Sequence, residues 1–355
     1  MTVLFRCNAS PTIGYGHLTR CRALAQALRR QGETCVMIGP VAADARPEDQ
    51  DIFSDWVPVP DWPSAAEDAT RLVDLARRFD AGWAVLDDYR VDETYQLTLR
   101  AAGLRWLQFD GTARKPLWAD LIVNANPAAH PEDYASVLHN PEAQLLLGPR
   151  YAVLRPEFAS VEPRDPQRPV KRILVTFGGG DDRGAIELVL STLLPETPSS
   201  VEFLVISGAG NPRNPSLVDW IDIFGQGRVS LHIDPPQVAP LFTTCDLAVI
   251  AGGTTIYEAA CCGLPMILIT IAENQAPQAM AWNRDGAAIF IGALTDISSG
   301  QILDSFRRFS SNSDGIVYQA RKALESSARN GAEIVAAEIN RRFSHASVPL
   351  TENLL

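Results

Sequence analysis

The feature that most constrains this chain is a pattern of strand, glycine turn and helix that occurs twice, at the N-terminus and again after residue 171. In the first copy the β-rich run 3–7 precedes a glycine turn, and apolar residues then recur at helical spacing from Leu18 to Leu28. Short buried strands that alternate with helices form parallel sheets through right-handed crossovers. The first half therefore predicts a doubly wound, Rossmann-like α/β domain.

The same alternation continues along both halves of the chain. In the first half the predicted strands after 3–7 are 34–38, 83–86, 106–109 and 121–124, and the predicted helices are 66–79 and 93–102. In the second half the predicted strands are 172–177, 201–206, 229–232, 247–250, 266–269 and 288–291. The predicted helices there are 184–194, 238–243, 255–262, 275–283 and a closing amphipathic helix around 316–343.

A segment rich in proline and charge separates the two halves. Residues 158–171 have few apolar anchors, which is typical of an interdomain linker. The length of 355 residues suits two domains. We therefore predict an N-terminal domain (1–157), this linker, a C-terminal domain (172–343) that includes the closing helix, and a polar tail (344–355). Two such domains are expected to face each other across a cleft.

Charge and hydropathy exclude several functional classes. The net charge of -11 argues against a nucleic-acid binder, which needs a broad basic face to coat phosphates. The longest apolar run, 264–272, is too short to cross a bilayer, and residues 1–7 lack the pattern of a signal peptide. The six cysteines form no metal-binding cluster, so we interpret them as reduced core residues. We expect a cytoplasmic protein with no nucleic-acid partner and no stable membrane association, and the oligomeric state stays open.

The first glycine turn carries Gly14, Gly16 and His17 immediately before the predicted helix. Glycines let the backbone approach a ligand closely, and the amides of a first helical turn attract an anion such as a diphosphate. The helix N-terminus disfavours the imidazolium form of His17, so the ring can accept a proton near neutral pH. His17 can alternatively cap the helix or pack, but the adjacent glycines clear space beside it and favour a functional role.

Two further glycine turns lie in the second half. The run 176–184 places Gly179 and Gly180 directly after a predicted strand. The other turn, Gly252–Gly253, precedes a helix that starts near Thr255. Thr255 to Glu258 matches a capping box, in which the carboxylate returns to the backbone amide of the cap residue. The glycines before it would instead bring backbone amides and threonine hydroxyls against a phosphate, and the same carboxylate can bind the hydroxyls of a ribose.

These residues carry a resemblance to a known family. The chain resembles the UDP-2,4-diacetamido-2,4,6-trideoxy-β-L-altropyranose hydrolases of pseudaminic acid biosynthesis, which are related to MurG-like GT-B glycosyltransferases. The matching stretches keep their order from the first strand to about residue 275 and are 9–21, 86–89, 147–158, 176–181, 252–258 and 274–275. Two of the patterns, GHxxRC at 16–21 and GGxTxYE at 252–258, are together fairly specific to this family.

The resemblance implies a GT-B fold and assigns roles to individual residues. It places His17 beside the anomeric carbon as the base that activates water, with Tyr89 and Asn274 near the sugar. It implies that UDP binds to the second domain. The residues that it places near the diphosphate and ribose are Gly179, Gly180, Gly252, Gly253, Thr254, Thr255, Glu258 and Gln275. Gly14 and Gly16 complete the substrate side in the first domain. The family commonly has Asp-Ala-Ser where this chain has Asn8-Ala-Ser, and Asp-Asp-Leu-Ala where it has 110–113, and both departures lie in the sugar-facing domain.

The chemistry then follows from the bond to be broken. Hydrolysis at C1 needs a positioned water, a base and stabilisation of the departing UDP, and displacement from the opposite face inverts the anomeric carbon. From the sequence we expect no metal requirement and no cofactor. The free sugar would enter nonulosonic acid biosynthesis and flagellin glycosylation. The sequence leaves open a GT-B glycosyltransferase and a non-catalytic UDP-sugar binding protein, and it leaves open whether Asp87, Asp88 or a backbone carbonyl orients His17.

Overall fold

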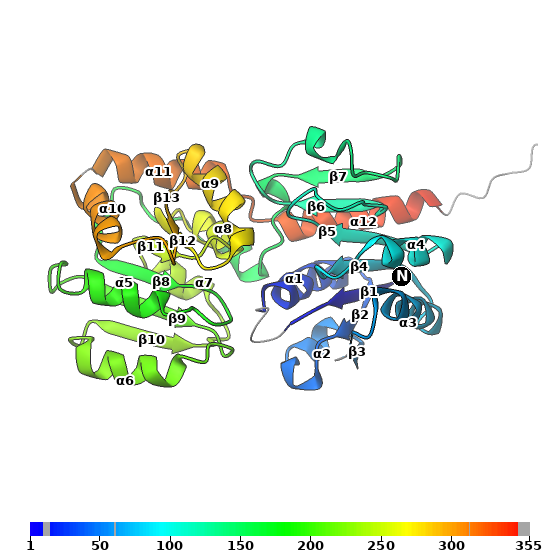
Figure 1. Cartoon of the computed structure of the whole chain (residues 1–355), viewed down its shortest axis with the longest axis horizontal. Coiled ribbons are helices and arrows are strands. Elements are labelled where there is room, and N and C mark those ends of the chain that lie inside the picture. The colour runs from blue at the N-terminus through cyan, green and yellow to red at the C-terminus, as the bar shows by residue number, and fades with distance from the viewer. Residues whose placement is uncertain (10–14, 60–61, 312, 347–355) are drawn as a thin grey trace, which may run out of the picture.

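Seven parallel strands form the sheet of the N-terminal domain in a computed structural model that describes residues 1–9, 15–59, 62–311 and 313–346 (Figure 1). The strands are β1 (Thr2–Cys7), β2 (Thr34–Gly39), β3 (Asp55–Pro58), β4 (Ala81–Asp87), β5 (Arg105–Phe109), β6 (Leu121–Asn124) and β7 (Gln144–Leu147), in the order β3-β2-β1-β4-β5-β6-β7. The helices of this part of the chain are α1 (Gly16–Arg30), α2 (Asp49–Ile52), α3 (Ala65–Arg78) and α4 (Glu93–Ala101). Short 3₁₀ turns add η1 (Ala42–Asp44), η2 (Pro131–Tyr134), η3 (Pro149–Tyr151) and η4 (Pro156–Ser160).

The C-terminal domain repeats this architecture with six parallel strands. They are β8 (Arg172–Thr176), β9 (Glu202–Ser207), β10 (Val229–Ile233), β11 (Leu247–Ile250), β12 (Met266–Thr270) and β13 (Ile289–Ala293), in the order β10-β9-β8-β11-β12-β13. The helices are α5 (Ala185–Leu193), α6 (Asn214–Phe224), α7 (Ala239–Thr243), α8 (Thr255–Cys261), α9 (Ala276–Arg284), α10 (Ser299–Ser311) and α11 (Ser313–Glu325), with the 3₁₀ turn η5 (Glu273–Gln275) before α9. The prediction of two doubly wound domains is confirmed.

Both sheets reverse their strand order at one point, and these points position the candidate site. In the N-terminal sheet β1 and β4 are neighbours, the strands that follow β1 lie on one side of this pair, and the strands that follow β4 lie on the other side. In the C-terminal sheet the same reversal occurs between β8 and β11. Ligands of open α/β sheets bind in the crevice outside the carboxyl ends of the strands at such a point. The turns after β1 and β4, and those after β8 and β11, are therefore where binding groups should gather.

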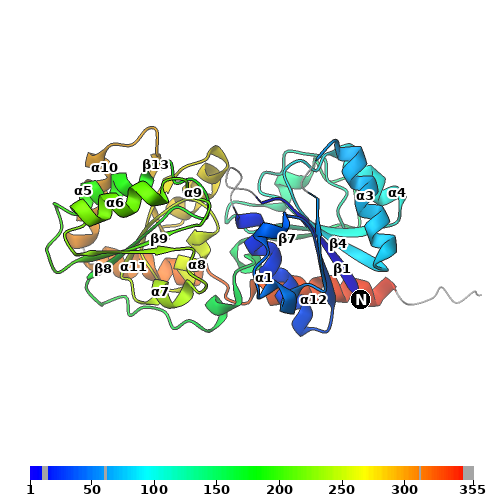
Figure 2. The ribbon, with the colours of Figure 1, turned by 90° about the horizontal axis from the view of Figure 1, so that it is seen from below.

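The last helix, α12 (Gly331–Ala346), packs on the N-terminal domain, whereas sequence analysis places residues 331–343 in the C-terminal domain. Figures 1 and 2 show α12 lying along that domain beside α1. Its buried residues join the N-terminal core and are Ala332, Val335, Ala336 and Ile339. The amphipathic pattern predicts a helix but does not say which surface covers its apolar face. The pattern at 316–343 is also two helices, α11 and α12, and residues 347–355 of the predicted tail lie outside the described residues.

The predicted linker is held more tightly than its composition indicates. Phe158 is fully buried in the C-terminal core. Arg164 and Arg168 place their Nε atoms 3.4 Å and 2.5 Å from the Oδ1 atom of Asp246, which lies just before β11. The buried carboxylate of Asp246 pairs with both guanidinium groups and so holds the linker against the C-terminal sheet. The predicted linker is therefore also the first part of the C-terminal domain.

Some elements carry too little signal for a sequence pattern to find. The strand β3 lies at the edge of its sheet, has four residues and is half exposed, so it shows neither a buried run nor a clean alternation. The helices α6 and α10 were not predicted either. In α6, Trp220 and Ile223 break the one-sided pattern and leave apolar side chains partly exposed. None of these elements contributes to the turns at the two reversal points.

Candidate active site

His17, Asp87 and Arg20 form one hydrogen-bonded cluster at the reversal point of the N-terminal sheet. His17 lies in the first turn of α1, and Asp87 is the last residue of β4. The Nδ1 atom of His17 lies 2.6 Å from Oδ1 of Asp87, and Arg20 donates to both carboxylate oxygens at 2.8 Å and 2.6 Å. A carboxylate only accepts, so Nδ1 carries the hydrogen and Nε2 is the nitrogen that can take a proton. Of the three groups that sequence analysis leaves open, Asp87 orients His17.

The Asp87 carboxylate stays ionised because its two partners outweigh its burial. Burial raises the pKa of this carboxyl, but the Arg20 guanidinium and the His17 ring lower it to about 2. The guanidinium is itself held in place, since it stacks over the Phe109 ring at 4.4 Å from the ring centroid. The histidine is therefore fixed in orientation by an anion that keeps its charge across the physiological range.

This shift predicts a loss of stability in acid. The pKa of Asp87 is lower in the folded protein than its ordinary value of 3.8, so its stabilisation is present above about pH 4 and is lost as the pH falls toward about 2. The difference corresponds to about 2 kcal/mol of unfolding free energy. Urea unfolding of the wild type and of Asp87→Asn at several pH values measures it. The free-energy gap between the two proteins should shrink over this window, and a constant gap would contradict the assignment.

Tyr89 and Asn274 meet across the two domains, above the histidine. The ring of Tyr89 contacts His17 edge to face, with centroids 4.8 Å apart. Its hydroxyl accepts a hydrogen bond from Nδ2 of Asn274 at 3.2 Å, although 59% of the tyrosine remains exposed. Asn274 lies in η5 of the C-terminal domain. The two residues that the resemblance puts near the sugar thus lie together, one from each domain.

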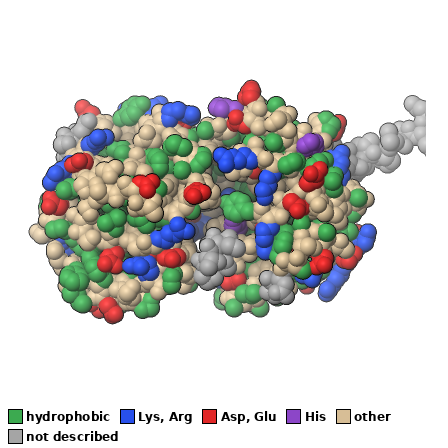
Figure 3. All heavy atoms as spheres, viewed as in Figure 1, with side chains coloured by type: hydrophobic (Ala, Val, Ile, Leu, Met, Phe, Trp, Pro, Cys, Tyr) green, Lys and Arg blue, Asp and Glu red, His purple; other side chains and the backbone are tan. Residues whose placement is uncertain are grey.

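A cleft between the domains collects several of the predicted residues. The surface is hollowed along the boundary between the two halves (Figure 3). The predicted residues that line this cleft are Tyr89, Gly252, Gly253, Thr254, Asn274 and Gln275. Asp87 and Arg20 line it as well, whereas His17 is 8% exposed and lies directly behind them. The predicted residues Gly16, Gly179, Gly180, Thr255 and Glu258 do not line it, and Gly14 lies outside the described residues.

The glycine loops of the two domains approach each other beside the cleft. A Cβ atom on Gly179 would lie 3.4 Å from Cβ of Tyr15, the residue before α1. A Cβ atom on Gly16 would meet nothing within 4 Å, so open space does lie beside His17, as the sequence predicts. Gly208, at the end of β9, supports the second loop because a Cβ there would lie 2.3 Å from Cα of Gly179. Only a residue without a side chain lets these two loops pack.

Replacing Gly208 with alanine should therefore displace the loop that contains Gly179. We expect a loss of about 1–3 kcal/mol of unfolding free energy, typical of overpacking, together with weaker binding of UDP. Urea unfolding and calorimetry with UDP measure the two effects. Gly300→Ala is the matched control, because a Cβ at this position in α10 meets only the Ser298 hydroxyl, at 3.7 Å, and the change should not weaken UDP binding. An unchanged UDP affinity in the Gly208 variant would contradict the predicted role of this loop.

The turn before α8 is closely packed and leaves backbone donors unused. A Cβ atom on Gly252 would lie 2.9 Å from side-chain atoms of both Thr270 and Gln275. The carbonyls of Gly252 and Gly253 accept hydrogen bonds from Nε2 of Gln278, at 3.0 Å each. The amides of Gly253 and Thr254 have no acceptor among the described residues. Donors that converge without acceptors suit an anion.

The capping box predicted for Thr255 and Glu258 is wrong. The residue that precedes α8 is Thr254, and no side chain caps this helix. Glu258 is instead buried, with Oε1 3.1 Å from Nε of Arg155. Burial raises the pKa of the Glu258 carboxyl in spite of this cation. The local pattern failed because Arg155, which lies before the linker and far away in sequence, supplies the partner of the carboxylate.

Sequence analysis missed several polar residues of the cleft. Asp110, Asn124 and Asn126 line its N-terminal wall, and Gln278 lines the opposite wall. Asp110 follows β5, Asn124 ends β6 and Asn126 lies two residues beyond it, and the carboxyl ends of neighbouring parallel strands meet at one edge of the sheet. This position was the signal that could have found them. Tyr257 was also missed, and its hydroxyl bridges the domains by lying 2.8 Å from the carbonyl oxygen of Ala125.

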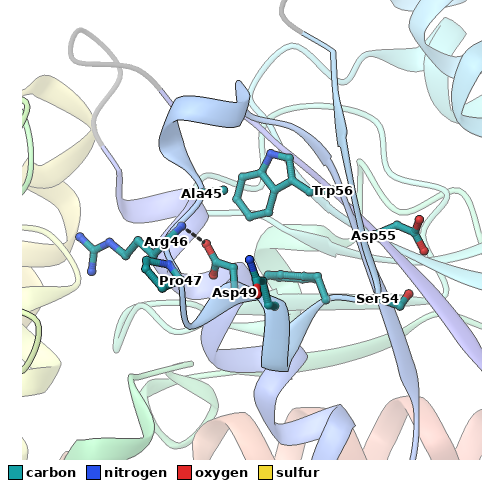
Figure 4. A pocket seen from close by; sticks show the side chains of 9 residues that line it. Ala45, Arg46, Pro47, Asp49, Ser54, Asp55 and Trp56 are labelled. Carbon is teal, nitrogen blue, oxygen red and sulfur yellow. Dashed lines mark hydrogen bonds between the residues drawn. The ribbon is translucent and has the colours of Figure 1, made fainter.

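A second hollow, of about 500 Å³, lies on the N-terminal domain away from the cleft (Figure 4). Figure 4 shows Asp49 hydrogen-bonded to the backbone amide of Arg46, at 2.8 Å, while the Arg46 guanidinium points away from the hollow. That guanidinium pairs with Asp234 of the other domain at 2.6 Å, and Arg22 occupies both oxygens of Asp49. The charges of Arg46 and Asp49 are already paired, so we assign no site to this hollow.

The described residues contain neither a cluster of metal ligands nor a membrane-spanning helix. Within residues 1–9, 15–59, 62–311 and 313–346, no three His, Cys, Asp or Glu side chains gather so that they could hold a metal ion. None of the helices described there is both long enough and apolar enough to span a bilayer. All six cysteines are buried, which confirms their interpretation as core residues.

Comparisons with known proteins agree on the resemblance and on the fold. No protein-family model matches the chain. The UDP-2,4-diacetamido-2,4,6-trideoxy-beta-L-altropyranose hydrolase of Campylobacter jejuni is 24% identical over 278 residues, which cover 78% of this chain and 93% of that protein. MurG of Acinetobacter baumannii superimposes with a TM-score of 0.69 at 15% identity, over 96% of this chain and 99% of its own. HepE of Anabaena in complex with UDP-glucose superimposes with a TM-score of 0.61 at 13% identity, over 96% and 100%. The chain thus resembles the hydrolase in sequence and has the GT-B fold.

Proposed function

We propose that this chain is an enzyme that hydrolyses a UDP-linked diacetamido-trideoxyhexose at C1 and releases UDP and the free sugar. The observation that carries the proposal is the His17–Asp87 pair, which lies at the reversal point of one sheet and against a cleft whose other wall carries glycine loops. A base oriented in this way beside a nucleotide-binding fold is suited to activate water. The relative named as a hydrolase supports the same reading.

The base step follows from the geometry of the histidine. Asp87 accepts from Nδ1, so Nε2 carries the lone pair that would take the proton of a water in the cleft. As the water attacks C1, its proton moves to Nε2, and the C1–O bond to the diphosphate breaks with both electrons leaving on UDP. The carboxylate of Asp87 then lies beside the imidazolium and stabilises its charge, as the acid of a catalytic triad does. Attack from the face opposite UDP inverts the configuration at C1.

The departing UDP gains negative charge, and the second domain offers groups to stabilise it. The amides of Gly253, Thr254 and Thr255 have no acceptor among the described residues, and those of Gly179 and Gly180 have none there either. Fixed backbone donors need no reorganisation when the charge develops. Glu258 would bind the ribose hydroxyls, which requires its carboxylate to share Arg155 with the ligand. The solved structure of HepE with UDP-glucose supports a UDP-sugar as the ligand class of this fold.

Tyr89 and Asn274 would contact the sugar and close the cleft over it. Their hydrogen bond joins the two domains directly beside His17. A sugar bound between them would be shielded from bulk water, which favours attack by the one water held by His17. The product sugar would serve nonulosonic acid biosynthesis.

A GT-B glycosyltransferase is the second candidate, and the likeness to MurG favours it. In that reaction the same base would deprotonate a hydroxyl acceptor instead of water. Incubation of the purified protein with UDP-sugars alone separates the two. We expect equal amounts of UDP and free sugar, identified by mass spectrometry over a panel that includes 2,4-diacetamido and altrose-configured compounds. Inert substrates that turn over only with an acceptor would favour the transferase, and tight UDP binding without turnover would favour a binding protein.

A further inference from the structure

The wall of the cleft that follows β5 and β6 carries two polar groups that have no partner among the described residues. Asp110 follows β5 and Asn126 lies two residues after β6, and both line the cleft. The two segments run side by side, since Phe109 pairs with Val123 and the Asp110 amide donates to the Val123 carbonyl at 3.0 Å. The turn before α8 lines the same cleft, so a sugar attached to a UDP bound at that turn would lie beside this wall.

Asp110 uses only one of its carboxylate oxygens within the protein. Its Oδ2 atom accepts from the Tyr134 hydroxyl at 2.9 Å and from the amides of Thr112 and Ala113 at 3.2 Å and 2.7 Å. Its Oδ1 atom has no hydrogen-bond partner among the described residues. Three donors on one oxygen fix the direction of the carboxylate, and the other oxygen remains an acceptor on the surface of the cleft.

The side chain of Asn126 is also fixed in orientation, but it offers a hydrogen-bond donor where Asp110 offers an acceptor. Its Oδ1 atom accepts from the amide of Ala128 at 2.9 Å, which assigns the side-chain amide and leaves Nδ2 as a donor with no acceptor in the described part of the chain. Its neighbour Asn124 is fully used, because Oδ1 accepts from the Asn126 amide at 3.0 Å and Nδ2 donates to Tyr134 at 2.9 Å. The wall therefore presents one fixed acceptor and one fixed donor.

Apolar side chains lie next to these two groups. Phe109, Tyr151 and Val153 line the same cleft. The ring of Phe109 is immobilised by the Arg20 guanidinium that stacks on it. A substituent that satisfies this wall needs an N–H for the carboxylate, a carbonyl for the amide and a methyl group for the apolar surface.

We propose that Asp110 and Asn126 are specificity-determining residues that select an acetamido substituent on the sugar. The inference rests on the proposed function and deepens it, because it names the residues that distinguish an acetamido sugar from a simple hexose. The acetamido N–H donates to Oδ1 of Asp110, and its carbonyl accepts from Nδ2 of Asn126. A uronic acid would place a second carboxylate against Asp110 and is rejected, since like charges in contact oppose binding.

The test compares UDP-sugars that differ in one substituent, measured by calorimetry so that no turnover is needed. The pairs are UDP-N-acetylglucosamine with UDP-glucose, and a UDP-2,4-diacetamido-trideoxyhexose with its 4-hydroxy analogue. In the wild type the acetamido compound of at least one pair should bind about tenfold or more tightly, which is the worth of one well-made hydrogen bond. Asp110→Asn and Asn126→Ala should each reduce that preference by about tenfold while leaving the affinity for UDP itself unchanged.

Controls separate the inference from a loss of folding and from the proposed reaction. Asp110→Asn keeps one side-chain oxygen that can accept from the Ala113 amide and from the Tyr134 hydroxyl. The melting temperature of this variant should therefore stay near that of the wild type. Asp74→Asn, an exposed carboxylate on α3, removes the same charge and should leave the preference unchanged. The inference is overturned if the wild type shows no acetamido preference in either pair, or if the two variants weaken UDP and UDP-sugars equally. If the preference shifts as expected but no UDP-sugar is hydrolysed, the reaction is wrong and the binding assignment stands.

Discussion

Replacing His17 with leucine is expected to slow the release of UDP from its sugar by about 10²- to 10⁴-fold, the usual contribution of general-base assistance. Leucine fills similar space and cannot take a proton. The donors before α8 stay in place, so the affinity for UDP should change little. Steady-state release of UDP and calorimetric binding of UDP measure the two quantities on one preparation.

His232→Leu is the matched control for this change. His232 lies on β10, at the far edge of the other sheet, and should keep the wild-type rate within about twofold, as a surface change away from the site does. The assignment of His17 fails if its leucine variant stays within a few-fold of the wild type. A large loss of UDP affinity in that variant would instead indicate that His17 binds the nucleotide.

Asp87→Asn is expected to lower kcat by about 10²-fold or more with little change in KM, because an amide can turn its N–H toward the ring and favour the wrong tautomer. Asp87 is a positioning residue that acts through His17 at 2.6 Å. The change also leaves the Arg20 guanidinium without its anion, so we expect a loss of stability of about 3–5 kcal/mol. Kinetics and urea unfolding must therefore be measured together.

Asp68→Asn separates these two consequences. Asp68 is a buried carboxylate in the same domain that binds Arg6 through both oxygens at 2.9 Å, and it does not line the cleft. Its replacement should lower stability to a similar extent while the folded protein keeps its kcat. If both aspartate variants lose the same activity, the loss reflects folding. If only Asp87→Asn shifts the pH dependence of kcat, the orienting role is supported.

The sequence predicts the local part of the site better than the part that depends on distant contacts. Gly16, His17, Gly252 and Gly253 were found because a strand, a glycine turn and a helix are contiguous in sequence. The same reasoning cannot choose between Asp87 and Asp88, since that choice depends on which side of β4 faces α1. In the structure Asp88 pairs with Arg90 at 2.6 Å and only Asp87 reaches the histidine.

Where the partner of a residue lies far away in sequence, the role of that residue was predicted wrongly or was not predicted. Glu258 matches a helix cap by its spacing, yet its partner Arg155 is about a hundred residues earlier. Asp110 lies where this chain departs from the family's usual Asp-Asp-Leu-Ala, and its position becomes informative only when β5 and β6 are known to be neighbours. Tyr89 and Asn274 were predicted from the resemblance to the hydrolase family. They lie in different domains, and only the folded structure brings them into contact.

The position of α12 has a consequence for the way the protein is made. A ribosome delivers the N-terminal strands first, but the groove beside α1 that α12 covers stays open until residues 331–346 emerge. The C-terminal domain, whose sheet and helices are contiguous between Arg172 and Glu325, can therefore be completed before the N-terminal domain that precedes it. A translation product that stops before Gly331 would carry one finished domain and one with an uncovered apolar groove, which cellular quality control would recognise.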